Sequence, residues 1–172
     1  MEFEAEIRNF VELATRHRVR MLLVGGGAVN FHGYKRHSAD VDFWIGLNPE
    51  NLQRLRSVLS EMGYRLDDFP DPVKKGEQNI SVKISPEMEI ELNTRFNPGK
   101  SFDDAYADSE ITHIESVEVA KYRVLSYDDL ISSKVRSKRP KDLLDIRELK
   151  RIRGESDRPK VFQPHCTTTC FE

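Results

Sequence analysis

Residues 22–45 read LLVGGGAVNFHGYKRHSADVDFWI, and this stretch decides the fold. An apolar run ends at three glycines, a segment of helix length follows, and Asp40 and Asp42 then stand two positions apart in a second apolar run. Side chains alternate faces along a strand, so both carboxylates point to one side while Val41 and Phe43 point into the core. The stretch therefore predicts a glycine turn placed beside two aligned carboxylates.

The aligned carboxylates predict a metal site. Two neighbouring carboxylates repel each other unless positive charge lies between them, and a hard divalent cation with oxygen ligands is the usual solution. Glycines at a helix start expose backbone N–H groups, where the helix dipole also favours phosphate. We expect Mg²⁺, with Mn²⁺ as the alternative, together with a phosphate-bearing ligand.

The bulk composition favours one soluble domain. The chain has 172 residues, of which 38% are hydrophobic and 33% charged, and no apolar run is long enough to span a bilayer. The start of the chain, Met1-Glu-Phe-Glu-Ala-Glu, is acidic where a signal peptide would be basic. We expect a cytoplasmic protein without membrane contact. Both cysteines lie in the last seven residues, which argues against a disulfide framework and redox chemistry.

The hydrophobic periodicity predicts an α/β (α+β) fold with a mixed, mostly antiparallel sheet backed by helices and followed by a C-terminal helical segment. Residues 1–125 would form the core, residues 126–153 a helical segment of the same domain, and residues 154–172 a flexible tail. Residues 67–76 are predicted to be a loop. The predicted helices are about 3–17, 25–31, 48–63, 126–138 and 139–153, and the predicted strands are 20–24, 40–45, 79–84, 88–92, 111–114 and 117–124.

A third carboxylate is expected from the strand at residues 88–92. In that strand Met88, Ile90 and Leu92 share one face. The other face carries Glu87, Glu89, Glu91 and Asn93. The charge of an exposed strand edge also explains glutamates at these positions, so at least two of the three are expected to be structural.

These motifs together resemble the polymerase-beta-like nucleotidyltransferase superfamily, whose signature is a glycine turn, an Asp-x-Asp about ten residues later and a third acid on a later strand. Gly25-Gly26-Gly27-Ala28, Gly33 and the Asp40-Val-Asp42 triplet match that signature. The chain is further similar to minimal nucleotidyltransferases, including the AbiEii-like toxin group. That similarity lies in Arg36-x-Ser38, Ile90-Glu91-Leu92-Asn93-Thr94, Ser133-Lys134 and Arg139-Pro-Lys-Asp142-Leu-Leu-Asp145.

The resemblance implies a role for each matching residue. Asp40, Asp42 and Glu91 would be the catalytic, metal-binding acids, with Glu91 as general base. Most relatives have Asp at this third position, and Glu89 on the same face is the competing choice.

The resemblance also implies contacts with the nucleotide. Gly25 and Gly26 would contact the triphosphate, and Ser38 would bond a phosphate oxygen or brace its loop. Lys134 would lie under the phosphates, with Arg139 and Lys141 close by. The alternative is that these C-terminal charges form helix ion pairs.

Two further features have a structural and a functional interpretation. His32 and His37 flank the glycine turn, where hydrogen-bonded structural histidines are the commoner outcome. His165, Cys166 and Cys170 fall short of a closed zinc site.

The resemblance implies transfer of a nucleoside monophosphate group from a nucleoside triphosphate to an acceptor hydroxyl. The acceptor would be RNA or protein, as in toxin–antitoxin pairs. Residues 134–160 hold eleven Lys and Arg against five Asp and Glu, which suits a polyanionic partner but also a solvated helix surface. The alternatives are a catalytically degenerate nucleotide-binding protein, a small-molecule (antibiotic) nucleotidyltransferase, and an unrelated Mg²⁺-dependent phosphatase or nuclease. Oligomeric state and base preference are left open.

Overall fold

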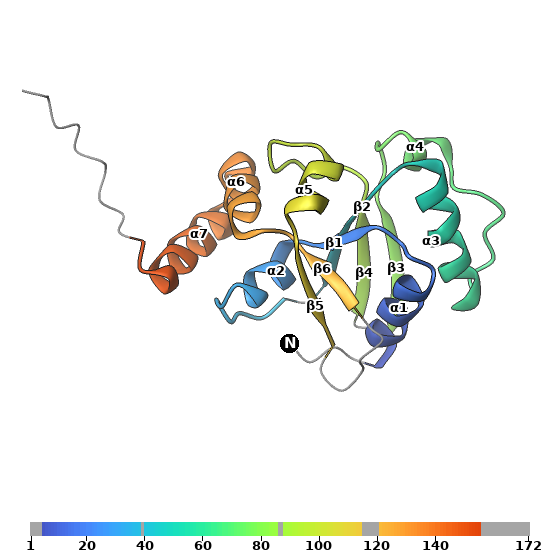
Figure 1. Ribbon diagram of the computed structural model, residues 1–172, viewed down its shortest axis with the longest axis horizontal. Coiled ribbons are helices and arrows are strands. Elements are labelled where there is room, and N and C mark those ends of the chain that lie inside the picture. Colours follow the sequence, from blue (N-terminus) through green and yellow to red (C-terminus); the bar gives the residue numbers. More distant parts are fainter. Residues whose placement is uncertain (1–4, 39, 86–87, 115–120, 156–172) are drawn as a thin grey trace, which may run out of the picture.

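A computed structural model describes residues 5–38, 40–85, 88–114 and 121–155. Its centre is a six-stranded sheet with the strand order β3-β4-β2-β1-β6-β5. The strands are β1 (Met21–Leu23), β2 (Val41–Ile45), β3 (Ile80–Ser85), β4 (Met88–Asn93), β5 (Glu110–His113) and β6 (Lys121–Val124). Figure 1 shows the sheet at the middle of the molecule.

The sheet is mixed and mostly antiparallel, as the sequence predicts. β1 pairs antiparallel with β2, β3 with β4, and β5 with β6, whereas β1–β6 and β2–β4 are parallel. The parallel β2–β4 pair aligns Asp42 with Glu91 and Trp44 with Asn93. The two predicted acidic strands are therefore direct neighbours in the sheet.

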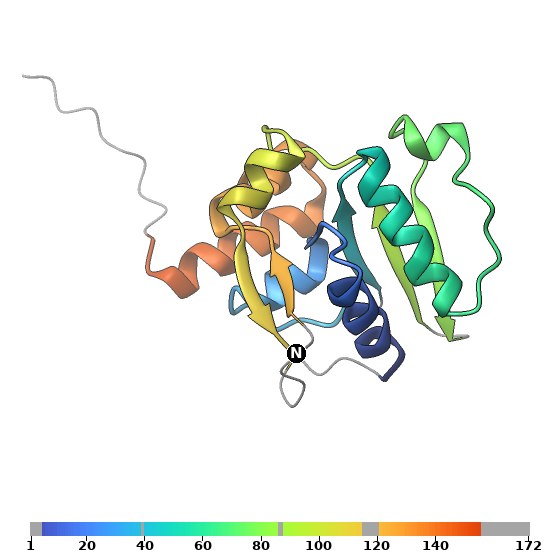
Figure 2. The ribbon, with the colours of Figure 1, turned by 45° about the vertical axis from the view of Figure 1, so that its right-hand side comes forward.

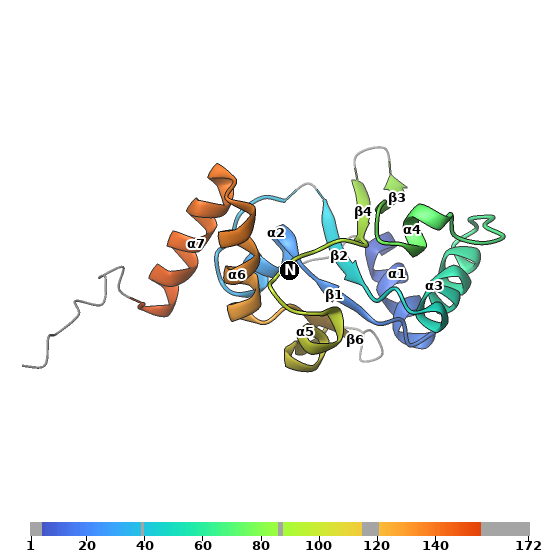
Figure 3. The ribbon, with the colours of Figure 1, turned by 90° about the horizontal axis from the view of Figure 1, so that it is seen from above.

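Helices gather on the sheet and at both ends of the molecule. In Figures 1 and 3, α6 and α7 lie side by side at one end, and α3 and α4 lie at the other. The helices are α1 (Ala5–Arg16), α2 (Gly25–Phe31), α3 (Pro49–Glu61), α4 (Asp71–Lys74), α5 (Phe102–Asp108), α6 (Tyr127–Ser137) and α7 (Pro140–Arg153). α1 packs against α3 and β6, and the turned view of Figure 2 shows α1 beside the strands.

Local sequence signals explain where the helices begin and end. The Asn48 side chain accepts a hydrogen bond from the Asn51 N–H at the start of α3, and Ser126 accepts one from Asp129 N–H at the start of α6. Pro140 opens α7 at a position where its missing N–H costs no helix bond. These caps hold the C-terminal helices at the predicted positions.

The core consists of the inward faces that the periodicity predicts. Phe10 of α1 lies 5.9 Å from Phe43 of β2 between ring centroids, and both rings are fully buried. Ile90, Leu92 and Leu125 are also fully buried. This packing covers one face of β2 and holds the strand rigidly. The side chains on the other face of β2 therefore have fixed positions.

One prediction about local structure is wrong, and one helix was not predicted. The segment 67–76 contains the short helix α4, which begins at Asp71 after Pro70. The sequence also did not predict α5, which Ser101 caps by accepting a hydrogen bond from the Asp104 N–H. The strand predicted at 117–124 is described only from Lys121, and the predicted tail lies beyond the described residues after Glu155.

Candidate active site

The glycine turn and the second aspartate are in direct contact where β1 ends and β2 begins. Val24 N–H donates to the Asp42 carbonyl at 2.9 Å. Gly25 has φ +57, and a Cβ on it would lie 2.3 Å from Asp42 Oδ2. Only glycine fits a left-handed backbone pressed against a carboxylate. The turn thus brings the start of α2 against the predicted metal ligand.

Gly26 is covered by Ser38 in the same way. A Cβ on Gly26 would lie 2.3 Å from Ser38 Oγ, and Ser38 Oγ itself donates to the Asp40 carbonyl at 3.1 Å. Of the two roles predicted for Ser38, the contacts present are those of a brace that closes the loop before β2.

Asp40 and Asp42 differ in their surroundings. Asp40 is exposed just before β2, whereas Asp42 is half-buried within it. Burial is the main cause that raises the pKa of the Asp42 carboxyl, and the negative charges of Asp40 and Glu91 raise it further. A hydrogen bond from Asn93 and the charge of Lys141 oppose this rise only in part. Negative charge at Asp42 is therefore incompletely compensated by the protein.

The third predicted acid, Glu91, is held by an amide rather than by a cation. Asn79 Nδ2 lies 3.0 Å from Glu91 Oε1 and 3.1 Å from Asn93 Oδ1, so it bridges the two side chains. Glu89 accepts a hydrogen bond from Ser81 Oγ at 2.8 Å. The bridge orients Glu91 and Asn93 together on the β4 face beside β2.

A cavity of about 690 Å³ opens over these residues. Gly25, Gly26, Ser38, Asp40, Asp42 and Lys134 all line it, so the structure brings six of the seven predicted site residues together. The seventh, Glu91, is not among the lining residues. The rest of the lining is supplied by Val24, Arg36, His37, Asn93, Arg95, Phe96, Asn97, Leu130, Ser133, Arg136, Ser137, Arg139, Lys141 and Asp142.

Several of these lining residues were not predicted. The sequence pattern places Asn93 on the strand face that also carries Glu91, but it assigned Asn93 no role in the site. The spacing of two residues between Glu91 and Asn93 was a signal that could have suggested one. Arg95 and Asn97 come from the segment after β4, and Arg136 from α6. No sequence pattern connects these segments to the glycine turn, because only the tertiary fold does so.

Lys134 is buried, and its ammonium group is committed to two carboxylates. Lys134 Nζ lies 3.1 Å from Asp142 Oδ1 and 2.7 Å from Asp145 Oδ2. Asp145 also accepts hydrogen bonds from Arg36 Nε at 2.8 Å and Nη2 at 3.1 Å. Asp142 accepts from Arg139 Nε at 2.7 Å and from Ser137. The ion-pair alternative thus describes the contacts that Lys134 and Arg139 make.

This ion-pair network joins α6 and α7 to the segment before β2. Asp142 and Asp145 have exposed fractions of 0% and 1%, so their charges depend entirely on protein partners. Burial alone would raise the pKa of the Asp142 carboxyl, but hydrogen bonds from Arg139, Ser137 and Lys134 hold it well below the ordinary value. One wall of the cavity is therefore fixed by buried charge pairs.

The histidines have separate environments. His32 Nε2 lies 2.8 Å from the Leu125 carbonyl, which is the hydrogen-bonded structural arrangement expected of a buried histidine. His37 is exposed and lines the cavity. His165, Cys166 and Cys170, which fall short of a closed zinc site in the sequence, lie outside the described residues.

The donor set of the cavity suits a hard cation, although its carboxylates are not gathered into a ready cage. Within the described ranges, no three His, Cys, Asp or Glu side chains are grouped closely enough to hold a metal. Asp40 and Asp42 nevertheless supply oxygen donors with uncompensated charge, which is the chemistry that Mg²⁺ and Mn²⁺ select. The residues present therefore fit such an ion.

Comparison with known protein families places the chain in one family. Residues 2–163 match the sequence profile of a family described as "Nucleotidyltransferase of unknown function (DUF6036)". The chain belongs to this family. The match supports the nucleotidyltransferase superfamily, but it does not single out the AbiEii-like group. A search of curated proteins gave no match.

The family assignment implies a nucleoside triphosphate as substrate, since nucleotidyl transfer begins from one. In this nucleotidyltransferase, no described helix has the length and apolar character required to cross a membrane.

Proposed function

We propose that the protein transfers a nucleoside monophosphate group from a nucleoside triphosphate to a hydroxyl group of RNA or protein. The acceptor oxygen forms a bond to the α-phosphorus, the bond between the α-phosphorus and the bridging oxygen breaks, and pyrophosphate leaves. The hydroxyl proton passes to a carboxylate. Phosphoryl chemistry of this kind needs positioning and charge neutralisation more than a protein nucleophile.

Asp42 is the observation that carries this proposal. It is half-buried, its pKa is raised by burial and by neighbouring carboxylates, and it touches the turn at Gly25. A carboxylate kept in this state is unfavourable for stability, and perturbed carboxylates in cavities are candidates for function. Its contact with a glycine turn at a helix start favours a phosphate-bearing ligand, which a nucleoside triphosphate is.

Asp40 and Asp42, with Glu91 as the predicted third acid, would hold Mg²⁺ or Mn²⁺, whose chemistry is to neutralise phosphate charge and activate a bound hydroxyl. The backbone N–H groups at Gly25 and Gly26 would approach the phosphates, because neither residue carries a side chain of its own. Glu91, oriented by Asn79, would accept the acceptor's proton as general base.

Incubation with α-labelled nucleotides tests the transfer directly. The protein is mixed with each labelled nucleoside triphosphate, Mg²⁺ or Mn²⁺, and separate RNA and protein fractions of a cell extract. Label on one fraction with release of pyrophosphate supports the proposal and identifies the acceptor class. The double variant Asp40→Asn/Asp42→Asn is the control and is expected to transfer no label. Equal labelling by that variant would contradict the assignment of the acids.

The contacts of Glu91 favour one second candidate, a nucleotide-binding protein without transfer activity. Its carboxylate is engaged by Asn79 and lies outside the cavity lining. In a binder of this kind, nucleotide titration would show binding that depends on Asp42, while no fraction would become labelled. An acceptor such as an antibiotic would instead give label on a small molecule.

A further inference from the structure

The cations around the cavity fall into two groups that differ in what they contact. Arg36, Lys134 and Arg139 form ion pairs with Asp142 or Asp145. Lys134 has an exposed fraction of only 4%, and both of its carboxylate partners are buried. Two of the three N–H donors of this ammonium group are engaged by these carboxylates, which already compensate its positive charge. The paired group is therefore suited to bracing the wall.

The second group consists of Arg95, Arg136 and Lys141, which are exposed and line the cavity. Within the part of the chain that the structure describes, none of the three has a carboxylate at ion-pair distance. Arg95 donates through Nε to the Gly76 carbonyl at 3.1 Å, which directs one edge of its guanidinium and leaves the charge uncompensated. These three residues will be called the unpaired cations.

The backbone holds two of the unpaired cations in unusual surroundings. A Cβ on Gly99, where φ is +96, would lie 2.6 Å from Arg136 Nη2, so the segment after β4 leaves room for this guanidinium through a glycine. Lys141 occupies the first turn of α7, where the helix dipole disfavours a cation. Helix stability does not explain the position of Lys141, whereas the last turn of α6 is a favourable place for the positive charge of Arg136.

Lys141 lines the same cavity as Asp40 and Asp42, and within the described residues it forms no ion pair with either carboxylate. The cavity thus has carboxylates on its floor and uncompensated cations on the wall made by α6, α7 and the segment after β4. A polyphosphate that shares a divalent cation with the carboxylates has the charge to satisfy both surfaces.

We propose that Arg95, Arg136 and Lys141 bind the polyphosphate of the nucleoside triphosphate, and that Lys134 braces the cavity wall without contacting phosphate. This inference rests on the proposed function and assigns the phosphate contacts within that site. It replaces the phosphate role that the family resemblance implied for Lys134. Guanidinium and ammonium groups without internal partners can form charge-assisted hydrogen bonds to phosphate oxygens at little structural cost.

Calorimetric titration tests the assignment. Mg²⁺ complexes of ATP, GTP, CTP and UTP are titrated into the full chain, and Mg²⁺ tripolyphosphate serves as a probe that needs no base. The double variant Arg136→Gln/Lys141→Gln is expected to bind the tripolyphosphate about 100-fold more weakly, roughly tenfold for each lost charged contact. Arg95→Gln should weaken it about tenfold.

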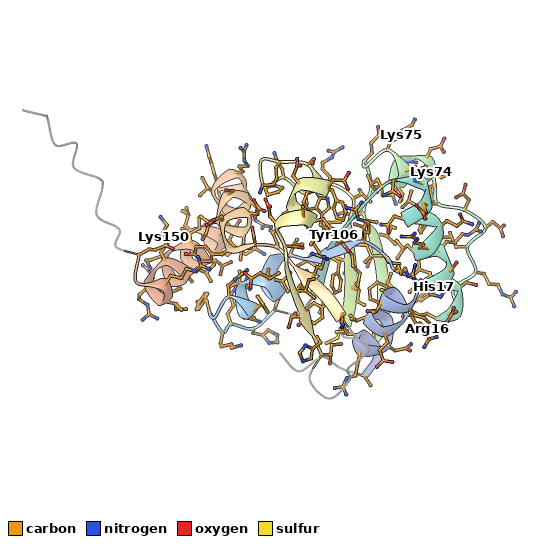
Figure 4. All side chains as sticks on the ribbon, viewed as in Figure 1. Arg16, His17, Lys74, Lys75, Tyr106 and Lys150 are labelled. Atoms are coloured by element: carbon orange, nitrogen blue, oxygen red, sulfur yellow. The ribbon has the colours of Figure 1, made fainter. Side chains whose placement is uncertain are left out.

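Lys75→Gln is the matched control. Lys75 is exposed and lies at the α4 end of the molecule in Figure 4, opposite the α6 and α7 end that carries the labelled Lys150. Its loss should leave tripolyphosphate affinity unchanged. Each variant's thermal unfolding is recorded first, so that a change in affinity is compared only between folded proteins.

The outcomes separate this inference from the proposed function. If the wild type binds a nucleotide and the double variant binds tripolyphosphate equally well, the inference is overturned while the function stands. A single-stranded RNA oligonucleotide is titrated in parallel, and a loss confined to RNA would assign the unpaired cations to the acceptor instead. Failure of the wild type to bind any of the four nucleotides would overturn the proposed function itself.

Discussion

Two pairs of aspartates lie at or next to the cavity, which Asp40, Asp42 and Asp142 line, and the two pairs have opposite environments. Asp142 and Asp145 on α7 are fully buried and receive ion pairs from α6 and from Arg36. Within the described residues, Asp40 just before β2 and Asp42 in β2 form no ion pair with a cation, although Asp42 is half-buried. The pKa of Asp142 is lowered, and that of Asp42 is raised.

The opposite shifts separate charge that stabilises the fold from charge that is available for a ligand. A carboxylate whose ionised form is favoured by the folded protein adds to stability, whereas one whose ionised form is disfavoured subtracts from it. The protein satisfies the acids on α7 internally. The negative charge of Asp42 at β2 is not fully compensated by the protein, which is the condition expected of a cation-binding site.

Removing the charge of Asp142 tests this contrast most strongly. Asp142→Asn would leave Lys134 and Arg139 without one shared partner, and breaking a buried ion pair costs about 3–5 kcal/mol. We expect the free energy of unfolding in urea to fall by that amount. Asp67→Asn is the control and should change it little, because Asp67 is exposed and forms no ion pair among the residues that the structure describes. A loss as small for Asp142→Asn as for the control would contradict a stabilising network.

The third acid can be tested with two glutamates on one strand face. If Glu91 is the general base, Glu91→Gln should lower turnover about 100-fold, the lower end of the range for general-base catalysis. Glu89→Gln should leave most of the activity. Glu89 is a close match because it shares the face and is likewise held by a hydrogen bond, from Ser81. Labelled nucleotide incorporation measures both, and the reverse ranking would move the role to Glu89.

The comparison also shows which parts of the site sequence alone can predict. Gly25 closely follows β1, and Asp42 lies in β2, the next strand along the chain, so a turn signal and a period of two were enough to place them together. The starts of α3, α6 and α7 followed from Asn48, Ser126 and Pro140, because caps are local. α5 was missed although Ser101 carries the same capping signal.

The ion-pair network could not be predicted to the same degree. Arg36 and Asp145 are 109 positions apart, and their contact exists only because α7 packs beside the segment before β2. Lys134 shows the limit most clearly. Its position in the sequence suited both a phosphate contact and an ion pair, and only burial and the two carboxylates within 3.1 Å distinguish them.

A smaller and opposite effect on stability is expected at Asp42. Asp42→Asn removes a half-buried charge repelled by Asp40 and Glu91 but keeps an oxygen that can accept from Asn93. Without metal, we expect the melting temperature to rise by about 2–4 °C, the change that ~1 kcal/mol produces in a domain of this size. Differential scanning calorimetry measures it. A fall in the melting temperature would mean that the Asp42 charge is compensated by the protein after all.

The metal response provides the complement to that measurement. Mg²⁺ stabilises only the state that binds it, so adding Mg²⁺ should raise the melting temperature of the wild type. The same addition should have little effect on Asp42→Asn, because a ligand is missing. Equal shifts in both proteins would place the bound ion away from Asp42.

The smallest effect expected is the pH dependence of the difference between wild type and Asp42→Asn. Because the folded protein raises the pKa of Asp42, it binds this proton more readily than the unfolded chain does. Stability from this group therefore falls as pH rises through the folded pKa, and the ionised carboxylate is unfavourable at neutral pH. On acidification the difference in stability between the two proteins should shrink, starting above the ordinary aspartate range.

The pH dependence from Asp142 has the opposite sign, since its contribution to stability is complete at neutral pH and is lost only as pH falls below the ordinary aspartate pKa. Unfolding curves of both proteins between neutral and mildly acidic pH measure the difference, and a gap that widened on acidification would reverse the roles assigned to the two aspartate pairs.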